Sequence, residues 1–313
     1  MNKLLVLLIS LAILGNLSAQ KKHKPKFKSR YTQKNWDNYR HEIEFGVGVT
    51  NYLGDLGGND GKAAQFSPKD VEISQSRYGF MLAYRYNLNR SFAVRPQLFY
   101  GKVSGSDQLT KNPERNYRNL AFSSTLIEFL VMGEYHLLRA DRGHRFYRKG
   151  VIGKPGKRIS LSVHLGAGFF YYNPKYGGVE LRPLSTEGQG LEGGPKPYKK
   201  MALAFPWGFS AGYQLSKTLR AGFDFTYRFT NTDYIDDVGG TYYNKEKIRS
   251  EKGDLAAEMS NRSDGSSPGN TLPGSPRGGN KGNDSYFMLS AIVTYTPVVR
   301  SHGIHKRRKR AKF

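Results

Sequence analysis

The feature that most constrains this chain is a two-residue alternation of apolar and polar side chains that recurs in eight segments. In the first segment, for example, Ile43, Phe45 and Val47 alternate with Glu44 and Gly46. Successive side chains of a β-strand point to opposite faces, so each segment predicts a strand with one apolar and one polar face. The predicted strands cover residues 41–52, 78–86, 92–100, 121–138, 159–172, 201–215, 219–230 and 285–297.

Strands of this kind fit either a soluble sandwich or a barrel in a membrane. In an outer-membrane barrel the apolar faces meet lipid, aromatic side chains gather at both interfaces and polar side chains fill the lumen. Predicted export, an even strand number and alternating short and long connections favour the barrel. We therefore predict an all-β fold, namely an eight-stranded antiparallel up-and-down transmembrane β-barrel with basic periplasmic termini. Its outer loops would be 53–77, 101–120, 173–200 and 231–284, and its inner connections 87–91, 139–158 and 216–218.

The ends of the chain indicate its location. A positive start followed by the apolar run 4–14 predicts a secretory signal peptide over 1–19, with an N-terminal core helix or anchor as the alternative. The remaining parts are a basic N-terminal segment (20–40), the barrel (41–297) and a basic tail (298–313). We expect an integral protein of the cell outer membrane with both termini in the periplasm.

Composition excludes several classes of protein. The absence of cysteine excludes disulfides, Cys-ligated zinc and a thiol nucleophile. A mean hydropathy of −0.61 argues against a helical membrane protein. The 36 glycines and 39 Phe and Tyr residues argue against a helical bundle. The isoelectric point near 10 would suggest nucleic acid as a partner in a cytoplasmic protein, but the predicted export and the lack of a nucleic-acid-binding motif argue against it.

The excess of positive charge is concentrated in three stretches, 21–40, 139–158 and 298–313. Together they carry 21 of the 23 net positive charges that remain after the predicted cleavage. All three face the periplasm in the predicted topology. A basic rim of this kind could bind an acidic periplasmic protein, anionic lipid or cell-wall polymer, and solvated tails without a partner are the alternative. The proposed partner-binding residues are Lys21, Lys22, Lys24, Lys26, Lys28, Arg142, Arg145, Arg148, Lys149, Lys306, Arg307, Arg308, Lys309 and Arg310.

The polar faces of the strands carry charges of both signs. The interior of a barrel of about eight strands is just wide enough for side chains to fill it, so a wide aqueous pore is not expected. Buried charges are tolerated when they pair. We predict a polar plug made by Glu42, Glu44, Arg85, Arg95, Glu128, Glu134, Arg220, Asp224 and Arg228.

Two pairs could in principle serve catalysis in a lipid-modifying or proteolytic barrel, Glu134 with His136 and Ser162 with His164. The members of each pair lie two residues apart on one face of a predicted strand, so packing in the lumen is the simpler interpretation. No catalytic residue is assigned. The GxG elements at 46–48 and 166–168 open no helix and do not support nucleotide binding.

Two places in the sequence offer candidate metal ligands. The HxxH pattern at 302–305 lies in a charged tail. Asp233, Asp236 and Asp237 could offer oxygen ligands to calcium, but their spacing does not match a regular calcium loop and turn caps explain them more simply. No metal or cofactor is predicted.

Two stretches carry a resemblance to a known family. NYLGDLGG (51–58) ends the first strand, and TDYIDDVGGTYYN (232–244) opens the last outer loop, followed by segments at 253–263 and 283–295. They resemble the PorG-type outer-membrane β-barrel family of Bacteroidetes, a component of the type IX secretion system. The motif residues are Asn51, Tyr52, Gly54, Asp55, Asp233, Tyr234, Asp236, Asp237 and Tyr242. The basic N-terminal stretch, the 139–158 connection and the basic tail depart from that family.

The resemblance implies a non-enzymatic protein that joins the periplasmic ring of a secretion and gliding machinery to the outer membrane, with secretion-system proteins and outer-membrane lipid as partners. A small transport or ligand-binding barrel and, less strongly, a lipid-modifying barrel enzyme are the alternatives. The last outer loop is rich in Gly, Ser, Asn and Pro between residues 260 and 283, which favours mobility there.

Overall fold

The computed structural model describes residues 40–56, 73–109, 113–140, 158–216, 218–263, 265, 268–278 and 282–297. The predicted signal peptide and most residues of the three basic stretches lie outside these ranges. The long strands are β1 (His41–Leu53), β2 (Arg77–Asn87), β3 (Phe92–Ser106), β4 (Ala121–Leu138), β5 (Ile159–Tyr176), β7 (Met201–Gln214), β8 (Leu219–Thr230) and β9 (Ser285–Tyr295).

The eight long strands close into an antiparallel barrel. Each long strand pairs with the next long strand along the chain. The two-residue strand β6 (Val179–Glu180) lies outside this order and pairs with the end of β5. The barrel closes where β9 pairs with β1, from Ile43 opposite Tyr295 to Leu53 opposite Ser285. The predicted eight-stranded antiparallel up-and-down barrel is confirmed. Among the described helices, none is long and apolar enough to cross a membrane.

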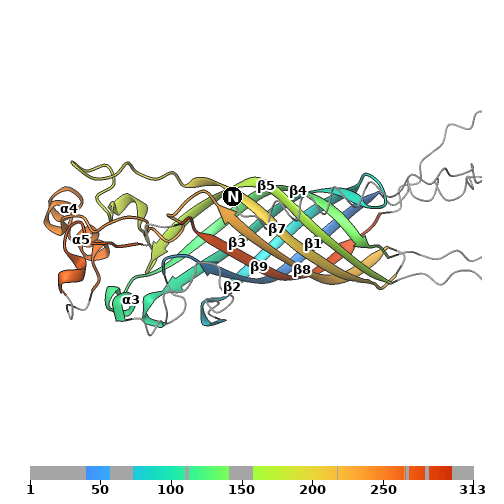
Figure 1. The fold of residues 1–313 in the computed structure, drawn as a ribbon, viewed down its shortest axis with the longest axis horizontal. Helices are drawn as coiled ribbons and strands as arrows, with labels where there is room; N and C mark the ends of the chain where they lie inside the picture. The colour runs from blue at the N-terminus through green and yellow to red at the C-terminus, as the bar shows by residue number, and fades with distance from the viewer. Residues whose placement is uncertain are drawn as a thin grey trace, which may run out of the picture. The chain divides into compact units, whose positions relative to one another are not determined.

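The two ends of the barrel differ. At one end, here called the turn end, residues 88–91 join β2 to β3 and residues 215–218 join β7 to β8. The other end, here called the loop end, carries the long connections with their short helices (Figure 1). These helices are η2 (Ile73–Gln75), η3 (Asp107–Leu109), α3 (Pro113–Arg118), η4 (Arg182–Leu184), α4 (Lys245–Lys252), α5 (Asp254–Ser260) and η5 (Pro268–Thr271).

Most predicted strand boundaries agree with the structure within two residues, but β3 and β5 are longer than predicted. β3 continues to Ser106 and β5 to Tyr176, whereas the predictions ended at 100 and 172. Both extensions pair with β4, at Gly105 opposite Phe122 and at Lys175 opposite Ser123. They were missed because the apolar alternation on the outward face stops before the strands themselves end.

The outward face of the barrel is an apolar belt. On β7, for example, Met201, Leu203, Phe205, Trp207, Phe209 and Tyr213 are all about half exposed. With a rise of about 3.3 Å per residue and a tilt of about 45°, the span from Met201 to Tyr213 is about 28 Å tall. That height fits the apolar band of an outer-membrane barrel, about 25 Å. Tyrosines mark its edge at the turn end, where Tyr84, Tyr135, Tyr213 and Tyr295 are exposed.

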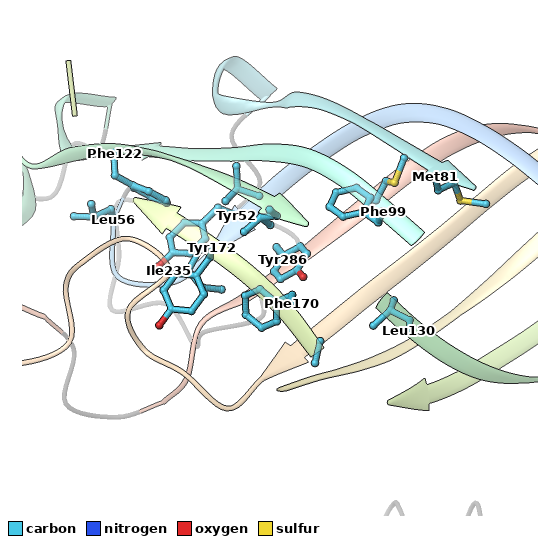
Figure 2. Close-up of a cluster of buried hydrophobic side chains, with 14 of the residues drawn as sticks. Tyr52, Leu56, Met81, Phe99, Phe122, Leu130, Phe170, Tyr172, Ile235 and Tyr286 are labelled. Carbon is cyan, nitrogen blue, oxygen red and sulfur yellow. The ribbon is translucent and has the colours of Figure 1, made fainter. Parts of the chain in front are cut away.

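The core of the protein is inside the barrel. Glycine, serine and charged residues alternate with the belt, and their side chains fill the lumen, as the alternation predicted. The half of the lumen near the turn end is ionic, and the half near the loop end is largely aromatic and aliphatic. Figure 2 shows part of this second half, where Phe99, Phe170 and Tyr286 lie between the strands and Tyr52, Phe122 and Ile235 lie nearer the loop end.

Candidate functional site in the lumen and at the loop end

Arg85 is the centre of the ionic network near the turn end. Its side chain is 2% exposed and contacts three carboxylates, from Nη1 to Glu42 at 2.9 Å, from Nη2 to Glu44 at 3.1 Å and from Nε to Glu134 at 2.7 Å. Arg220 adds a contact of 2.6 Å between its Nη2 and Glu42. These residues lie on β1, β2, β4 and β8, so the Arg85 guanidinium links β2 to β1 and β4, and Arg220 of β8 joins the network through Glu42.

Arg95 extends this network across the lumen. Its Nη1 lies 2.9 Å from Asp224 Oδ1 and 3.2 Å from Glu44 Oε1, and its side chain is fully buried. Asp224 also accepts hydrogen bonds from the hydroxyls of Ser210, at 2.6 Å, and Thr226, at 2.7 Å. Four carboxylates therefore face the guanidinium groups of Arg85, Arg95 and Arg220, which is the pairing that buried charges require.

The histidines proposed as possible catalytic groups belong to the same packing. His164 is buried, and its Nε2 lies 3.0 Å from the Thr226 hydroxyl. His136 Nδ1 lies 3.5 Å from Glu134, and its Nε2 lies 3.2 Å from Asn87. Each ring is surrounded by neighbours within the barrel, which supports packing in the lumen rather than a reaction site at a rim.

A second ion pair lies in the aromatic half of the lumen. Arg228 Nε is 3.2 Å from Glu128 Oε2, and both side chains are fully buried. The Arg228 guanidinium also lies over the rings of Phe99, at 5.0 Å, and Tyr286, at 5.5 Å. The Tyr286 hydroxyl donates to the other carboxylate oxygen of Glu128. With this pair, all nine residues of the predicted polar plug are in ion pairs, so the prediction is confirmed and the lumen is filled along its length.

The motif residues from the two distant stretches meet at the loop end. Tyr52, at the end of β1, donates its hydroxyl proton to Asp284, which lies just before β9. The other oxygen of Asp284 accepts a hydrogen bond of 2.8 Å from the backbone of Ile235. Asn51 is buried and donates to the Ser76 hydroxyl at 3.3 Å. At Gly54 a side chain would collide with the Tyr52 hydroxyl and Asp284, so the close approach requires glycine.

The aspartates of the 232–244 stretch have different roles. Asp236 accepts a hydrogen bond of 2.9 Å from the backbone of Val238, which is the turn cap that the sequence suggested. Asp237 instead accepts hydrogen bonds of 2.5 Å from the hydroxyls of Thr186 and Tyr198. The stretch is therefore a structural junction, because its side chains bond to the connection between β5 and β7.

Arg277 and Glu187 complete this junction, and sequence analysis assigned neither. Arg277 is 2% exposed, lies 3.1 Å from Glu187 Oε1 and donates to the carbonyl of Asp237 at 2.7 Å. The same Glu187 oxygen accepts from the backbone amides of Gly239, at 3.1 Å, and Gly240, at 3.2 Å. Arg277 lies in the Gly-rich and Pro-rich segment expected to be mobile, and that composition gave no indication of a buried ion pair.

Three further residues, Arg118, Tyr234 and Tyr242, hold the loop end together. Arg118 pairs with Asp107 at 2.8 Å and donates to the backbone carbonyl of Asp55 at 2.8 Å. The ring of Tyr234 stacks on that of Tyr198, with centroids 4.6 Å apart. Tyr242 is buried, and its backbone amide donates to the carbonyl of Ser275 at 2.9 Å. All four long connections between the strands thus contribute to one packed cap, here called the loop-end cap.

The loop-end cap contains an excess of carboxylates. Burial, together with the charges of Asp55, Asp236 and Glu187, raises the pKa of Asp233 to about 9. Burial and the charges of their acidic neighbours also raise the pKa values of Asp236 and Asp284 well above the usual range. Because burial without a cation disfavours the ionised form, Asp233 holds its proton near neutral pH.

No metal centre is formed by the parts of the chain that the structure describes. Within those ranges, no group of three or more His, Asp or Glu side chains is arranged to hold a metal ion. The calcium alternative for Asp233, Asp236 and Asp237 therefore gains no support from the geometry, since Asp237 is directed to Thr186 and Tyr198.

The 14 residues proposed for the basic rim fall outside the described ranges, so that assignment stays a prediction. What the structure does place is where the chain leaves the barrel. Residues 40, 140, 158 and 297, which border the three basic stretches, all belong to the turn end. Three basic residues of these stretches are described there: Arg40 contacts Tyr86, Arg139 lies 4.0 Å from Glu42, and Arg158 donates to the Tyr213 hydroxyl at 3.2 Å.

The chain matches a family model described as "Domain of unknown function (DUF6089)" over residues 31–258, and it belongs to this family. No curated protein shows a significant match to the sequence.

Several solved outer-membrane proteins are similar in structure. Neisserial surface protein A is 7% identical, with a TM-score of 0.39, and the match covers 82% of this chain and 96% of that one. Ail of Yersinia pestis, in complex with the heparin analogue sucrose octasulfate, is 9% identical with a TM-score of 0.34 and the same coverages. OprG of Pseudomonas aeruginosa is 10% identical with a TM-score of 0.29, again over 82% and 96%. At these values no function is carried over from them.

Proposed function

We propose that this member of the DUF6089 family is a sealed, non-enzymatic barrel of the outer membrane that docks a periplasmic assembly through the basic stretches at its turn end. The observation that carries the proposal is the position of the chain exits. Residues 40, 140, 158 and 297 lie at one end of the barrel, and the stretches that they border contain 21 of 23 net positive charges. A rim so charged attracts an acidic protein partner.

The lumen and the belt support the same function. The apolar belt of about 28 Å matches a lipid bilayer. Ion pairs centred on Arg85, Arg95 and Arg228 fill the lumen, so a solute would have to break buried salt bridges to pass. A filled barrel suits an anchor for other proteins better than the transport barrel considered as the alternative.

The assembly that we propose is the type IX secretion and gliding apparatus. This step rests on the resemblance of residues 51–58 and 232–244 to the PorG-type family. Tyr52 and Asp55 from the first stretch and Asp236 from the second meet in the loop-end cap, so both stretches serve one structural unit.

Co-purification from detergent-solubilised outer membrane tests the proposal. The first variant replaces Lys306, Arg307, Arg308 and Lys309 with glutamine, and the second removes residues 141–157 but keeps Arg139 and Arg158. We expect both variants to lose periplasmic secretion-system proteins from the pull-down and to retain heat-modifiable migration on gels, because neither change touches the barrel.

A matched control removes four positive charges at the loop end instead. Replacing Lys245, Lys247, Arg249 and Lys252 of α4 with glutamine should leave the co-purified proteins unchanged. Equal recovery of partners by the turn-end variants and the wild type would refute docking through the basic rim. Labelling of Lys309 by a membrane-impermeant reagent on intact cells would refute the orientation.

A further inference from the structure

One wall of the barrel carries a cluster of lysines just beyond the apolar belt at the loop end. On β3 the exposed Tyr100 is followed two residues later by Lys102. On β5 the outward positions after Tyr171 are Asn173 and Lys175. Next to them, Lys199 and Lys200 precede the exposed Met201 of β7. These lysines, here called the lysine wall, are the first charged residues that follow the belt on β3, β5 and β7.

The strand register brings the lysine wall together. Lys102 is opposite Thr125 of β4, and Thr125 is in turn opposite Asn173 of β5. The backbone amide of Tyr172 donates to the carbonyl of Lys200, which fixes Lys200 beside β5. With neighbouring strands about 4.8 Å apart and a rise of about 3.3 Å per residue, Asn173 lies roughly 10 Å from Lys102 across β4, and Lys175, two residues further along β5, lies roughly 12 Å from Lys102. β4 supplies only hydroxyl side chains between them, from Ser123 and Thr125.

Glu180 on β6 holds two of these lysines in place. Lys200 Nζ lies 2.9 Å from Glu180 Oε2, and Lys175 Nζ lies 3.3 Å from Oε1. Hydrogen bonds from Lys200, Asn173 and Lys175 lower the pKa of Glu180 to about 2. One carboxylate thus bridges two partly exposed ammonium groups, and the lysine wall keeps a net positive charge because Lys102 and Lys199 add to it.

The opposite wall has no such cluster within the described residues. There the outward positions beyond the exposed Phe229 of β8 and Leu289 of β9 are occupied by Asn231 and Phe287. The positive charge is therefore on one side of the barrel, at the level where the apolar belt gives way to polar side chains. In a membrane this is the level of the lipid headgroups.

We propose that the lysine wall binds the phosphate groups of lipid A in the outer leaflet, with Lys102, Lys175 and Lys200 as the main contacts. A phosphate carries the charge and the acceptor oxygens that bridge ammonium groups on adjacent strands, as Glu180 does. The acyl chains would lie along the belt below, at Tyr100, Ile127 and Tyr171. This inference rests on the outer-membrane location proposed above and requires no protein partner.

Native mass spectrometry of the detergent-purified full-length protein tests it, with bisphosphorylated lipid A and the same lipid stripped of phosphate as the probes. A basic residue near a charged membrane surface contributes about 1 kcal/mol, so each lysine removed should weaken binding roughly fivefold. The variants are Lys102→Gln alone and Lys175→Gln with Lys200→Gln. A matched control replaces Lys245, Lys247 and Lys252 of α4 with glutamine and should bind like the wild type.

Glu180→Gln provides a change in the opposite direction. It removes the carboxylate that competes with phosphate, so lipid A should bind more tightly, whereas a merely structural role of Glu180 would give weaker binding. Heat-modifiable migration verifies that each variant is folded. If the double variant of Lys175 and Lys200 does not fold, the two single variants Lys102→Gln and Glu180→Gln decide the case.

Equal binding of the dephosphorylated lipid, equal weakening by the α4 control or full competition by phosphatidylglycerol would each overturn the proposal. Because the measurement contains no partner protein, its failure leaves the docking function standing, and loss of docking leaves the lipid site standing.

Discussion

Replacing Arg95 with methionine is expected to destabilise the barrel strongly, and the structure indicates which interaction is responsible. Arg95 is fully buried and contacts Asp224 at 2.9 Å and Glu44 at 3.2 Å. After its removal Glu44 still has Arg85, at 3.1 Å, and the Thr294 hydroxyl, at 2.9 Å. Asp224 keeps only hydroxyl donors at short distance, so most of the lost stability comes from leaving this buried carboxylate without a positive partner.

The expected magnitude follows from the cost of an unpaired buried charge. Removing one partner of a buried pair typically costs about 3–5 kcal/mol, whereas removing both is often close to neutral. We therefore expect Arg95→Met to lower the free energy of unfolding by about 3–5 kcal/mol. The double variant Arg95→Met with Asp224→Asn should recover to within about 2 kcal/mol of the wild type, because no buried charge is left unpaired and the neutral amide accepts from one of the Ser210 and Thr226 hydroxyls while its NH2 group donates to the other.

Urea unfolding in lipid vesicles, followed by tryptophan fluorescence and by heat-modifiable migration, measures these differences. Trp207 lies in the belt, about half exposed, and reports the transfer from lipid to water. A conservative control, Leu203→Met on the outward face, should change the free energy of unfolding by less than about 1.5 kcal/mol. A double variant no more stable than Arg95→Met, or a loss below about 1 kcal/mol in the single variant, would refute the assignment of the plug to paired charges.

Three further outcomes are expected. The wild type should give no stepwise conductance in planar bilayers because its lumen is filled, and stable channels would contradict this. Raising the pH from 7 to 10 should loosen the loop-end cap. The pKa of Asp233 is about 9 in the folded protein, far above its value in an unfolded chain, so the folded protein keeps a proton that the unfolded chain has lost. The stability of the cap therefore falls as the pH rises through 9. Hydrogen exchange at Val238, corrected for intrinsic rates, measures this, and Asp233→Asn should flatten the dependence. Arg277→Met leaves the Glu187 carboxylate without its ion-pair partner and should speed proteolysis within 231–284 without affecting the barrel. The control Arg249→Met, at an exposed ion pair, should not change the rate of proteolysis. Equal cleavage of the two variants would contradict the role assigned to Arg277 in the loop-end cap.

The strands and their facing could be predicted from the sequence because lipid and lumen impose opposite demands on alternate residues. On β4, Glu128 and Glu134 alternate with Phe129 and Tyr135, and on β8, Asp224 alternates with Phe223 and Phe225, so regularly that the predicted boundaries of both strands agree with the structure. Where lipid contact ends, the constraint ends too. The extensions of β3 and β5 were missed for that reason, since Lys102 and Lys175 sit at positions that no longer face hydrocarbon.

The partners within the lumen could not be predicted, although their presence could. Which carboxylate meets Arg95 depends on the stagger of strands around the barrel, and Asp224 is 129 residues away in the chain. In the loop-end cap the motif residues were identified, but Arg277 and Glu187 carry no local pattern. The start of α4 does carry a local signal, since Asn244 is a typical N-cap residue and its side chain accepts from the backbone amides of Glu246 and Lys247.

The bond between Tyr52 and Asp284 has a consequence for biogenesis. These residues are 232 positions apart: Tyr52 is on β1, and Asp284 directly precedes β9, the strand that closes the barrel against β1. Until β9 pairs with β1, Asp284 lacks this donor, and the burial that raises its pKa in the folded protein is absent. This bond therefore couples the packing of the loop-end cap to the closure of the barrel. A folding intermediate without β9 would therefore leave the Tyr52 hydroxyl without its partner and this part of the loop-end cap unfinished.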